Sequence, residues 1–167
     1  TGKQLPTRIH IIIETNAGLE AVFDIARSSP RIDALFFGGV DMSAELRCAN
    51  SWDALLYARS RVVHAAASAE IDAIDVPHMD LDDAEGLEAD ARRARELGFC
   101  GKGAIHPKQI SAINQVFTPD PETVDRARSV VRAFEESDSA LVVIDGKLIE
   151  KPVLREMKRI LMIADSI

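Results

Sequence analysis

Residues 9–14 read IHIIIE and residues 34–41 read ALFFGGVD. Each stretch holds a short apolar run that ends at a polar residue or a glycine pair, a pattern typical of buried strands. Between them, residues 17–26 carry apolar side chains at helical spacing. This strand–helix–strand order predicts two parallel strands joined by a crossover helix.

The same alternation continues along the chain. Proline and glycine mark several ends: Gly98 stands where a helix C-terminus is expected, and Pro107 can open a helix. The sequence predicts, in order, a helix over 53–69, a strand over 72–76, a helix from an Asp80 cap to Leu97, a strand over 102–105, helices over 107–118 and 121–137, a strand over 140–144, an Asp145-Gly146 turn and a helix from Pro152.

Four β/α units therefore occupy residues 8 to 118, which predicts a parallel sheet covered by helices. A (β/α)₈ barrel needs eight such units and roughly 200 residues at the least. The 167 residues are compatible with a small open sheet or with half of a barrel, and length does not choose between them.

Composition narrows the class of protein. The chain is 47% hydrophobic with a net charge of −7, which argues against disorder and against nucleic acid as a partner. No apolar run approaches the roughly 20 residues of a membrane helix, and the first residues lack the apolar core of a signal peptide. Two cysteines form no disulfide framework, which favours a cytoplasmic location.

Two carboxylates follow the first two predicted strands. Glu14 comes directly after the first strand, and Asp41 follows the second strand and its Gly38-Gly39 pair. Carboxyl ends of neighbouring parallel strands share one edge, and two carboxylates with room for water suit Mg²⁺. Glycines at 38 and 39 would let a ligand approach the backbone. The alternative is that both are ordinary exposed acids.

Five segments of the chain carry a resemblance to a known family. The chain resembles the citrate lyase β-subunit-like family of the HpcH/HpaI aldolase superfamily, which contains metal-dependent carbon–carbon lyases. The matching segments appear in family order: IETNAG at 13–18, FGGVDM at 37–42, ARSRVV at 58–63, GKGAIHPKQI at 101–110 and VIDGK at 143–147.

The resemblance implies a fold. Family members are (β/α)₈ TIM barrels, so residues 1–118 would be the C-terminal half of the barrel, strands five to eight. Residues 119–167 would form a C-terminal helical and hairpin extension that carries the Asp-Gly-Lys turn. The missing first half holds an arginine that contacts substrate in the family.

The resemblance also implies site residues. Glu14 and Asp41 match the Mg²⁺ ligands, and the backbone of Gly38, Gly39 and Val40 would help to hold the 2-oxo acid. Asp145 matches an acid/base residue that acts across a subunit interface in related acyl-CoA lyases; a plain hairpin turn at Asp145-Gly146 is compatible with that role.

Further residues have two interpretations each. Ile105, His106 and Pro107 match a loop near the coenzyme A region, while His106 alternatively caps its loop. Lys102 is expected to meet coenzyme A phosphates or solvent, and Asp75 is expected on the rim of the sheet.

The implied function is a Mg²⁺-dependent lyase. It would cleave a 3-hydroxyacyl-CoA of malyl, citramalyl or citryl type to acetyl-CoA and a 2-oxo acid, as a homotrimer or homohexamer. The alternative is a non-catalytic or truncated half-barrel that binds metal or a partner without turnover. The sequence does not determine which 2-oxo acid is released.

Overall fold

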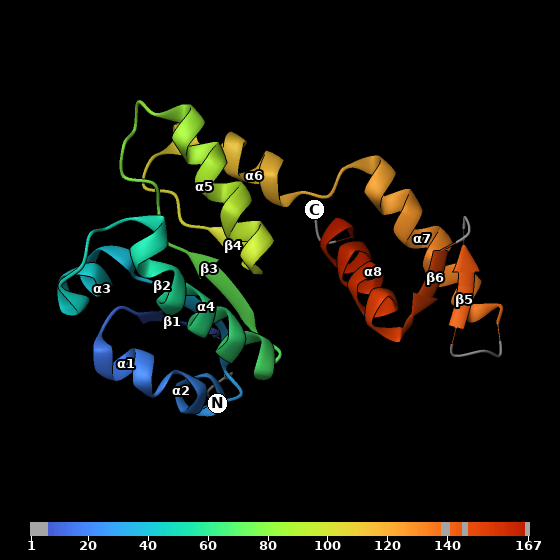
Figure 1. Cartoon of the computed structure of the whole chain (residues 1–167), viewed down its shortest axis with the longest axis horizontal. Coiled ribbons are helices and arrows are strands. Elements are labelled where there is room, and N and C mark those ends of the chain that lie inside the picture. The colour runs from blue at the N-terminus through green and yellow to red at the C-terminus, as the bar shows by residue number, and fades with distance from the viewer. Residues whose placement is uncertain (1–6, 138–140, 145–146, 166–167) are drawn as a thin grey trace, which may run out of the picture. The chain divides into compact units, whose positions relative to one another are not determined.

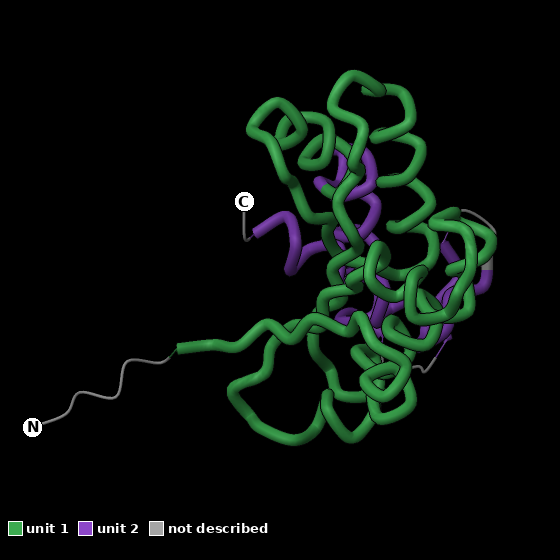
Figure 2. Tube along the Cα trace, turned by 90° about the vertical axis from the view of Figure 1, so that its left-hand side faces the viewer, with its two compact units in different colours: residues 1–117 green, residues 118–167 purple. Residues whose placement is uncertain are grey.

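A computed structural model describes residues 7–137, 141–144 and 147–165 of the chain. The chain divides into two compact units between residues 117 and 118 (Figure 2). The elements of the first unit are β1 (Ile9–Ile13), α1 (Asn16–Glu20), α2 (Val22–Arg27), β2 (Ile32–Phe37), α3 (Gly39–Leu46), α4 (Trp52–Ser68), β3 (Asp72–Asp75), α5 (Ala84–Leu97), β4 (Gly101–Lys102), the 3₁₀ turn η1 (Pro107–Gln109) and α6 (Ile110–Phe117). Those of the second are α7 (Pro121–Glu135), β5 (Leu141–Ile144), β6 (Lys147–Glu150) and α8 (Lys151–Ala164).

The first unit is built on a parallel sheet. Its strands lie in chain order, β1-β2-β3-β4, and every neighbouring pair is parallel. In the second unit β5 and β6 pair antiparallel as a hairpin. The predicted α/β class with a parallel sheet is confirmed, whereas its identity as half of a TIM barrel stays a prediction.

One face of this sheet packs against helices. Successive strand residues point to opposite faces, and Ile13, Leu35 and Phe37 share the buried one. They form one core with Leu55 and Val62 of α4, which lies alongside the sheet in Figure 1. Because these side chains are fully buried, the helix-covered face supplies most of the hydrophobic stabilisation of the unit.

The other face carries a row of apolar side chains across three strands. Ile12 pairs with Phe36, and Phe36 pairs with Ile74, so the three lie in one register row. Ile12 is 56% exposed. Phe36 and Ile74 are half-buried, and the exposure of Ile12 is unusual because parallel sheets are ordinarily covered on both faces.

Several local predictions differ from the structure. The stretch 17–26 forms two short helices, α1 and α2, rather than one. Helix α5 begins at Ala84 with Asp83 as its cap, and not at Asp80, because Asp80 instead accepts the Asp82 N–H in a tight turn. The fourth strand is only two residues long, and α3 is absent from the sequence prediction.

Among the described residues, no helix combines the length and apolar character that crossing a membrane requires.

Candidate functional site

Two of the predicted site residues meet at the carboxyl end of the sheet. Glu14 follows β1, and Asp41 lies in the first turn of α3, which follows the neighbouring strand β2. Both line a single hollow of ≈ 390 Å³ together with Thr15, Ala44 and Glu45. The structure therefore brings the two carboxylates to one site from two adjacent β/α units.

Hydrogen bonds fix the loop that carries Glu14. The Asn16 backbone N–H donates to Glu45 Oε2 at 3.1 Å, and Asn16 Nδ2 donates to the Glu45 carbonyl at 3.2 Å. Thr15 caps α1 by accepting the Gly18 N–H at 3.1 Å. These bonds join the Glu14 loop to α3, the helix of Asp41. Sequence reasoning assigned no role to Thr15, Asn16 or Glu45, although Thr15 is a recognisable helix cap.

The glycine pair has a specific steric role. A Cβ atom at Gly38 would lie 2.4 Å from Glu14 Cβ and 2.9 Å from Glu14 Oε2. The Gly38 N–H also donates to the Ile13 carbonyl at 3.0 Å, which continues the β1–β2 pairing past the strand ends. The Glu14 side chain therefore lies directly against Gly38. The absence of a side chain at Gly38 leaves the space that the Glu14 carboxylate occupies.

The hollow carries the negative charges of its acidic lining residues, Glu14 and Asp41 among them. In the part of the chain that the structure describes, neither Glu14 nor Asp41 forms an ion pair. No cluster of three or more His, Cys, Asp or Glu side chains among the described residues could hold a metal ion. Two carboxylates beside open space fit Mg²⁺, which commonly takes one or two protein carboxylates and fills its other positions with water and substrate oxygens.

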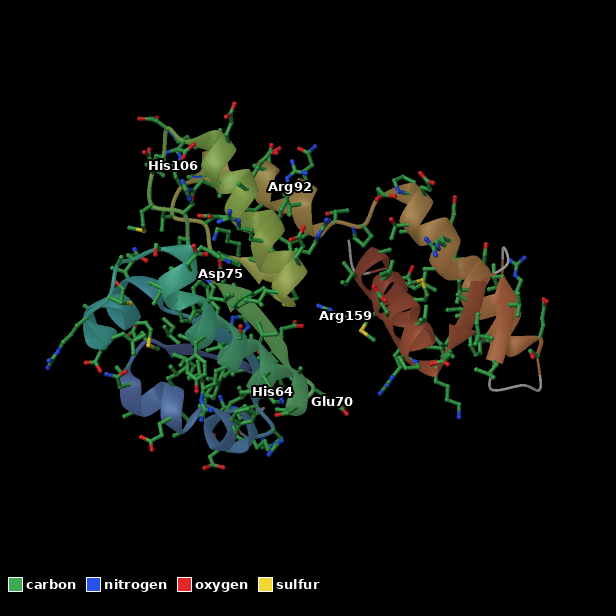
Figure 3. All side chains as sticks on the ribbon, viewed as in Figure 1. His64, Glu70, Asp75, Arg92, His106 and Arg159 are labelled. Carbon is green, nitrogen blue, oxygen red and sulfur yellow. The ribbon has the colours of Figure 1, made fainter. Side chains whose placement is uncertain are left out.

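Asp75, Arg59 and Lys102 form a second, buried set of charges. Asp75 is completely buried and accepts from Arg59 Nε at 2.9 Å and from Lys102 Nζ at 2.8 Å. The Arg59 guanidinium also lies 5.0 Å from the Phe37 ring centre and 4.6 Å from that of Trp52. Figure 3 shows Asp75 at the end of β3, inside the first unit. Asp75 ends β3 as predicted, but its side chain is buried and is not open to a ligand on the rim. The expectation that Lys102 meets coenzyme A or solvent is wrong, because its ammonium group is buried against Asp75.

The remaining site residues of the first unit occupy two places. Gly39 and Val40 stand with Asp41 in the first turn of α3, and α3 has no side-chain cap at Gly38. Ile105, His106 and Pro107 lie after β4, two strands away from β2, and Figure 3 shows His106 among the loops at that end of the unit. His106 caps η1 by accepting the Lys108 N–H.

Asp145, the predicted acid/base residue, lies outside the described residues.

With this geometry in place, comparisons with known proteins identify the family. Residues 2–107 match the model of the HpcH/HpaI aldolase/citrate lyase family, and the chain belongs to that family. It is 33% identical over 181 residues to a protein named mitochondrial citramalyl-CoA lyase of Mus musculus, covering 99% of this chain and 54% of the mouse protein.

The chain is also similar to solved protein structures. RipC from Yersinia pestis is 44% identical with a TM-score of 0.69, over 70% of this chain and 54% of that one. CitE from Mycobacterium tuberculosis, solved in complex with magnesium, acetoacetate and coenzyme A, is 27% identical with a TM-score of 0.78, over 95% of this chain and 61% of that one. The chain thus spans about half the length of the relatives it matches.

Proposed function

We propose that this chain forms part of a Mg²⁺-dependent carbon–carbon lyase that cleaves a 3-hydroxyacyl-CoA thioester into acetyl-CoA and a 2-oxo acid. The observation that carries the proposal is the hollow that Glu14 and Asp41 share, where neither carboxylate forms an ion pair with another described residue. The names of the relatives support it, since they include lyases for citramalyl-CoA and malyl-CoA thioesters.

Glu14 and Asp41 would hold the metal ion. When bound, Mg²⁺ supplies Lewis acidity toward the oxygens of the 2-oxo acid. The first N–H groups of α3, at Gly39 and Val40, have no partner within the helix, and they offer donors for the carboxylate of that acid. The glycine at 38 leaves the Glu14 carboxylate in place beside them.

The reaction breaks the bond between the carbinol carbon and the carbon next to the thioester. The hydroxyl group gives its proton to a water molecule as the carbinol carbon becomes the carbonyl of the 2-oxo acid. The electron pair of the broken bond becomes the thioester enolate, which takes a proton on carbon to give acetyl-CoA. We assign this protonation to Asp145, and the support is the resemblance of the Asp-Gly-Lys sequence.

The fold proposal accompanies the functional one. We propose that residues 1–118 are strands five to eight of a (β/α)₈ barrel and that residues 119–167 are its C-terminal extension. The apolar row of exposed Ile12 with half-buried Phe36 and Ile74 supports this, because the interior of a closed barrel would cover that face. A homotrimer or homohexamer is proposed from the resemblance alone.

The test is an assay of the complete protein chain for acetyl-CoA release from malyl-CoA and citramalyl-CoA. We expect release that depends on Mg²⁺, disappears with EDTA and returns when Mg²⁺ is restored. Intact mass should lie well above 18.3 kDa if a first half of the barrel precedes these residues.

The alternative has its own signature. A non-catalytic half-barrel would bind Mg²⁺ in a titration calorimeter yet release no acetyl-CoA from either thioester at saturating metal. That result would reject the lyase proposal and leave a metal-binding fragment.

A further inference from the structure

Gln109 is a buried amide that joins two loops at the carboxyl end of the sheet. Its side chain is almost fully covered, with 2% of the residue exposed. Its Oε1 accepts the Ile105 N–H at 3.0 Å, and its Nε2 donates to the His78 carbonyl at 2.8 Å. The two ends of one amide therefore hold the loop after β3 and the loop after β4 at a fixed separation.

The loop after β3 is itself anchored. His78 Nδ1 and Asp90 Oδ2 of α5 are 2.8 Å apart, which ties that loop to the helix. Pro77 fills the space beside Gly103, where an added Cβ would come within 2.9 Å of Pro77 Cγ. Gln109 thus connects the loop after β4 to the loop after β3, which is itself fixed to α5.

A second tie between the loops is weaker. Lys108 Nζ donates to Asp82 Oδ1 at 3.0 Å, but both side chains are exposed. Exposed ion pairs contribute little, whereas a buried amide with both ends bonded is costly to disrupt. Gln109 is consequently the tie that controls the shape of the loop after β4.

That shape decides what the loop presents outward. Ile105 is 49% exposed and His106 is exposed. His106 Nδ1 accepts the Lys108 N–H at 3.2 Å, so the neutral imidazole carries its proton on Nε2. The loop therefore offers an apolar side chain and an Nε2–H donor to a ligand.

We propose that Gln109 is a positioning residue: it holds residues 105–107 in the conformation that receives the coenzyme A thioester. This inference rests on the proposed lyase function and on the resemblance that assigns residues 105–107 to the coenzyme A region. Gln109 touches no reacting atom and acts only through the Ile105 N–H and the His78 carbonyl. Its loss should weaken thioester binding and leave the Glu14–Asp41 hollow, two strands away, unaffected.

The test compares Gln109→Leu, which removes both hydrogen bonds, with Gln109→Glu, which keeps an acceptor for the Ile105 N–H. In the complete protein we expect KM for the acyl-CoA to rise about tenfold in Gln109→Leu and less in Gln109→Glu. The Mg²⁺ concentration for half-maximal activity should not change. Gln115→Leu, at an exposed position of α6, is the matched control and should behave as the wild type.

The result against the proposal is an unchanged KM, or equal changes in KM and in Mg²⁺ dependence, which would indicate a general structural effect. If Gln109→Leu does not fold, Gln109→Glu decides by the same two readouts. If the wild type releases no acetyl-CoA, the lyase function fails separately, and calorimetry with coenzyme A decides. Weaker binding by Gln109→Leu then supports the proposal, and equal or absent binding in both proteins overturns it.

Discussion

Two groups of charged side chains in the first unit behave in opposite ways. Asp75 is buried between Arg59 and Lys102, and its carboxylate has a cation on each oxygen at 2.9 and 2.8 Å. Glu14 and Asp41 line an open hollow and form no ion pair among the described residues. The comparison separates two kinds of acid. A buried carboxylate with paired cations stabilises the fold, whereas carboxylates without such a pair at the edge of the sheet can bind a metal cation.

The largest expected effect is on stability at the buried group. Asp75→Asn leaves two buried cations without their counter-charge, which should lower the free energy of unfolding by about 3–5 kcal/mol. Urea unfolding of the complete protein measures this. Asp72→Asn, at an exposed position of the same strand, should change stability little. Equal stability of the two variants would contradict a structural role for Asp75.

Replacing a carboxylate by an amide at Glu14 or Asp41 should affect activity rather than stability. Asp41→Asn and Glu14→Gln each remove a proposed metal ligand, so Mg²⁺-dependent kcat/KM should fall at least about 100-fold. Thermal midpoints should stay close to that of the wild type, because Asp41 is exposed and neither carboxylate has an ion-pair partner to lose among the residues that the structure describes. Glu20→Gln, exposed at the end of α1, is the control. Retained turnover in either variant would remove that residue from the metal site.

A smaller effect is expected from a substitution that shifts the Glu14 side chain without removing its charge. Gly38→Ala adds a methyl group 2.4 Å from Glu14 Cβ, so the Glu14 side chain must move and Mg²⁺ affinity should fall about tenfold. Gly101→Ala is the matched control, because a Cβ there meets nothing within 4 Å. Titration calorimetry with Mg²⁺ distinguishes them, and equal affinities would mean that Gly38 does not set the Glu14 position.

The smallest effect concerns Asp120, an exposed acid in the second unit that accepts hydrogen bonds from a backbone N–H and a hydroxyl group. The N–H and hydroxyl of Thr123 donate to Asp120, the cap of α7, and hold its pKa below the ordinary value of 3.8. A lowered folded-state pKa stabilises the fold above the unfolded pKa, and this contribution disappears as pH falls below 3.8.

Asp120→Asn should therefore show a shallower loss of thermal midpoint than the wild type between about pH 5 and pH 2. Asp125→Asn, exposed on the same helix, is the control. Identical pH profiles for wild type and Asp120→Asn would contradict the assigned role.

The sequence predicted much of the fold because local patterns carried it. The apolar runs at 9–13 and 34–37 became β1 and part of β2, Gly98 adopted the left-handed cap conformation with φ 112°, and Asp120-Pro121 began α7. Each of these signals resides within a few residues. The start of α5 was misplaced because aspartates stand at 80, 82 and 83, close enough for each to cap the same helix, and only the folded turn selects Asp83.

The sequence by itself determined the alternating α/β order and the family, and it identified Glu14 and Asp41 as candidate ligands at the ends of two strands. Only the tertiary structure decided that Asp75 and Lys102 neutralise each other in the interior, and that Gln109 joins two rim loops. The physical reason is range. Strands and caps follow from neighbouring residues, whereas charge burial and loop bracing depend on partners 27 and 31 positions apart in the chain.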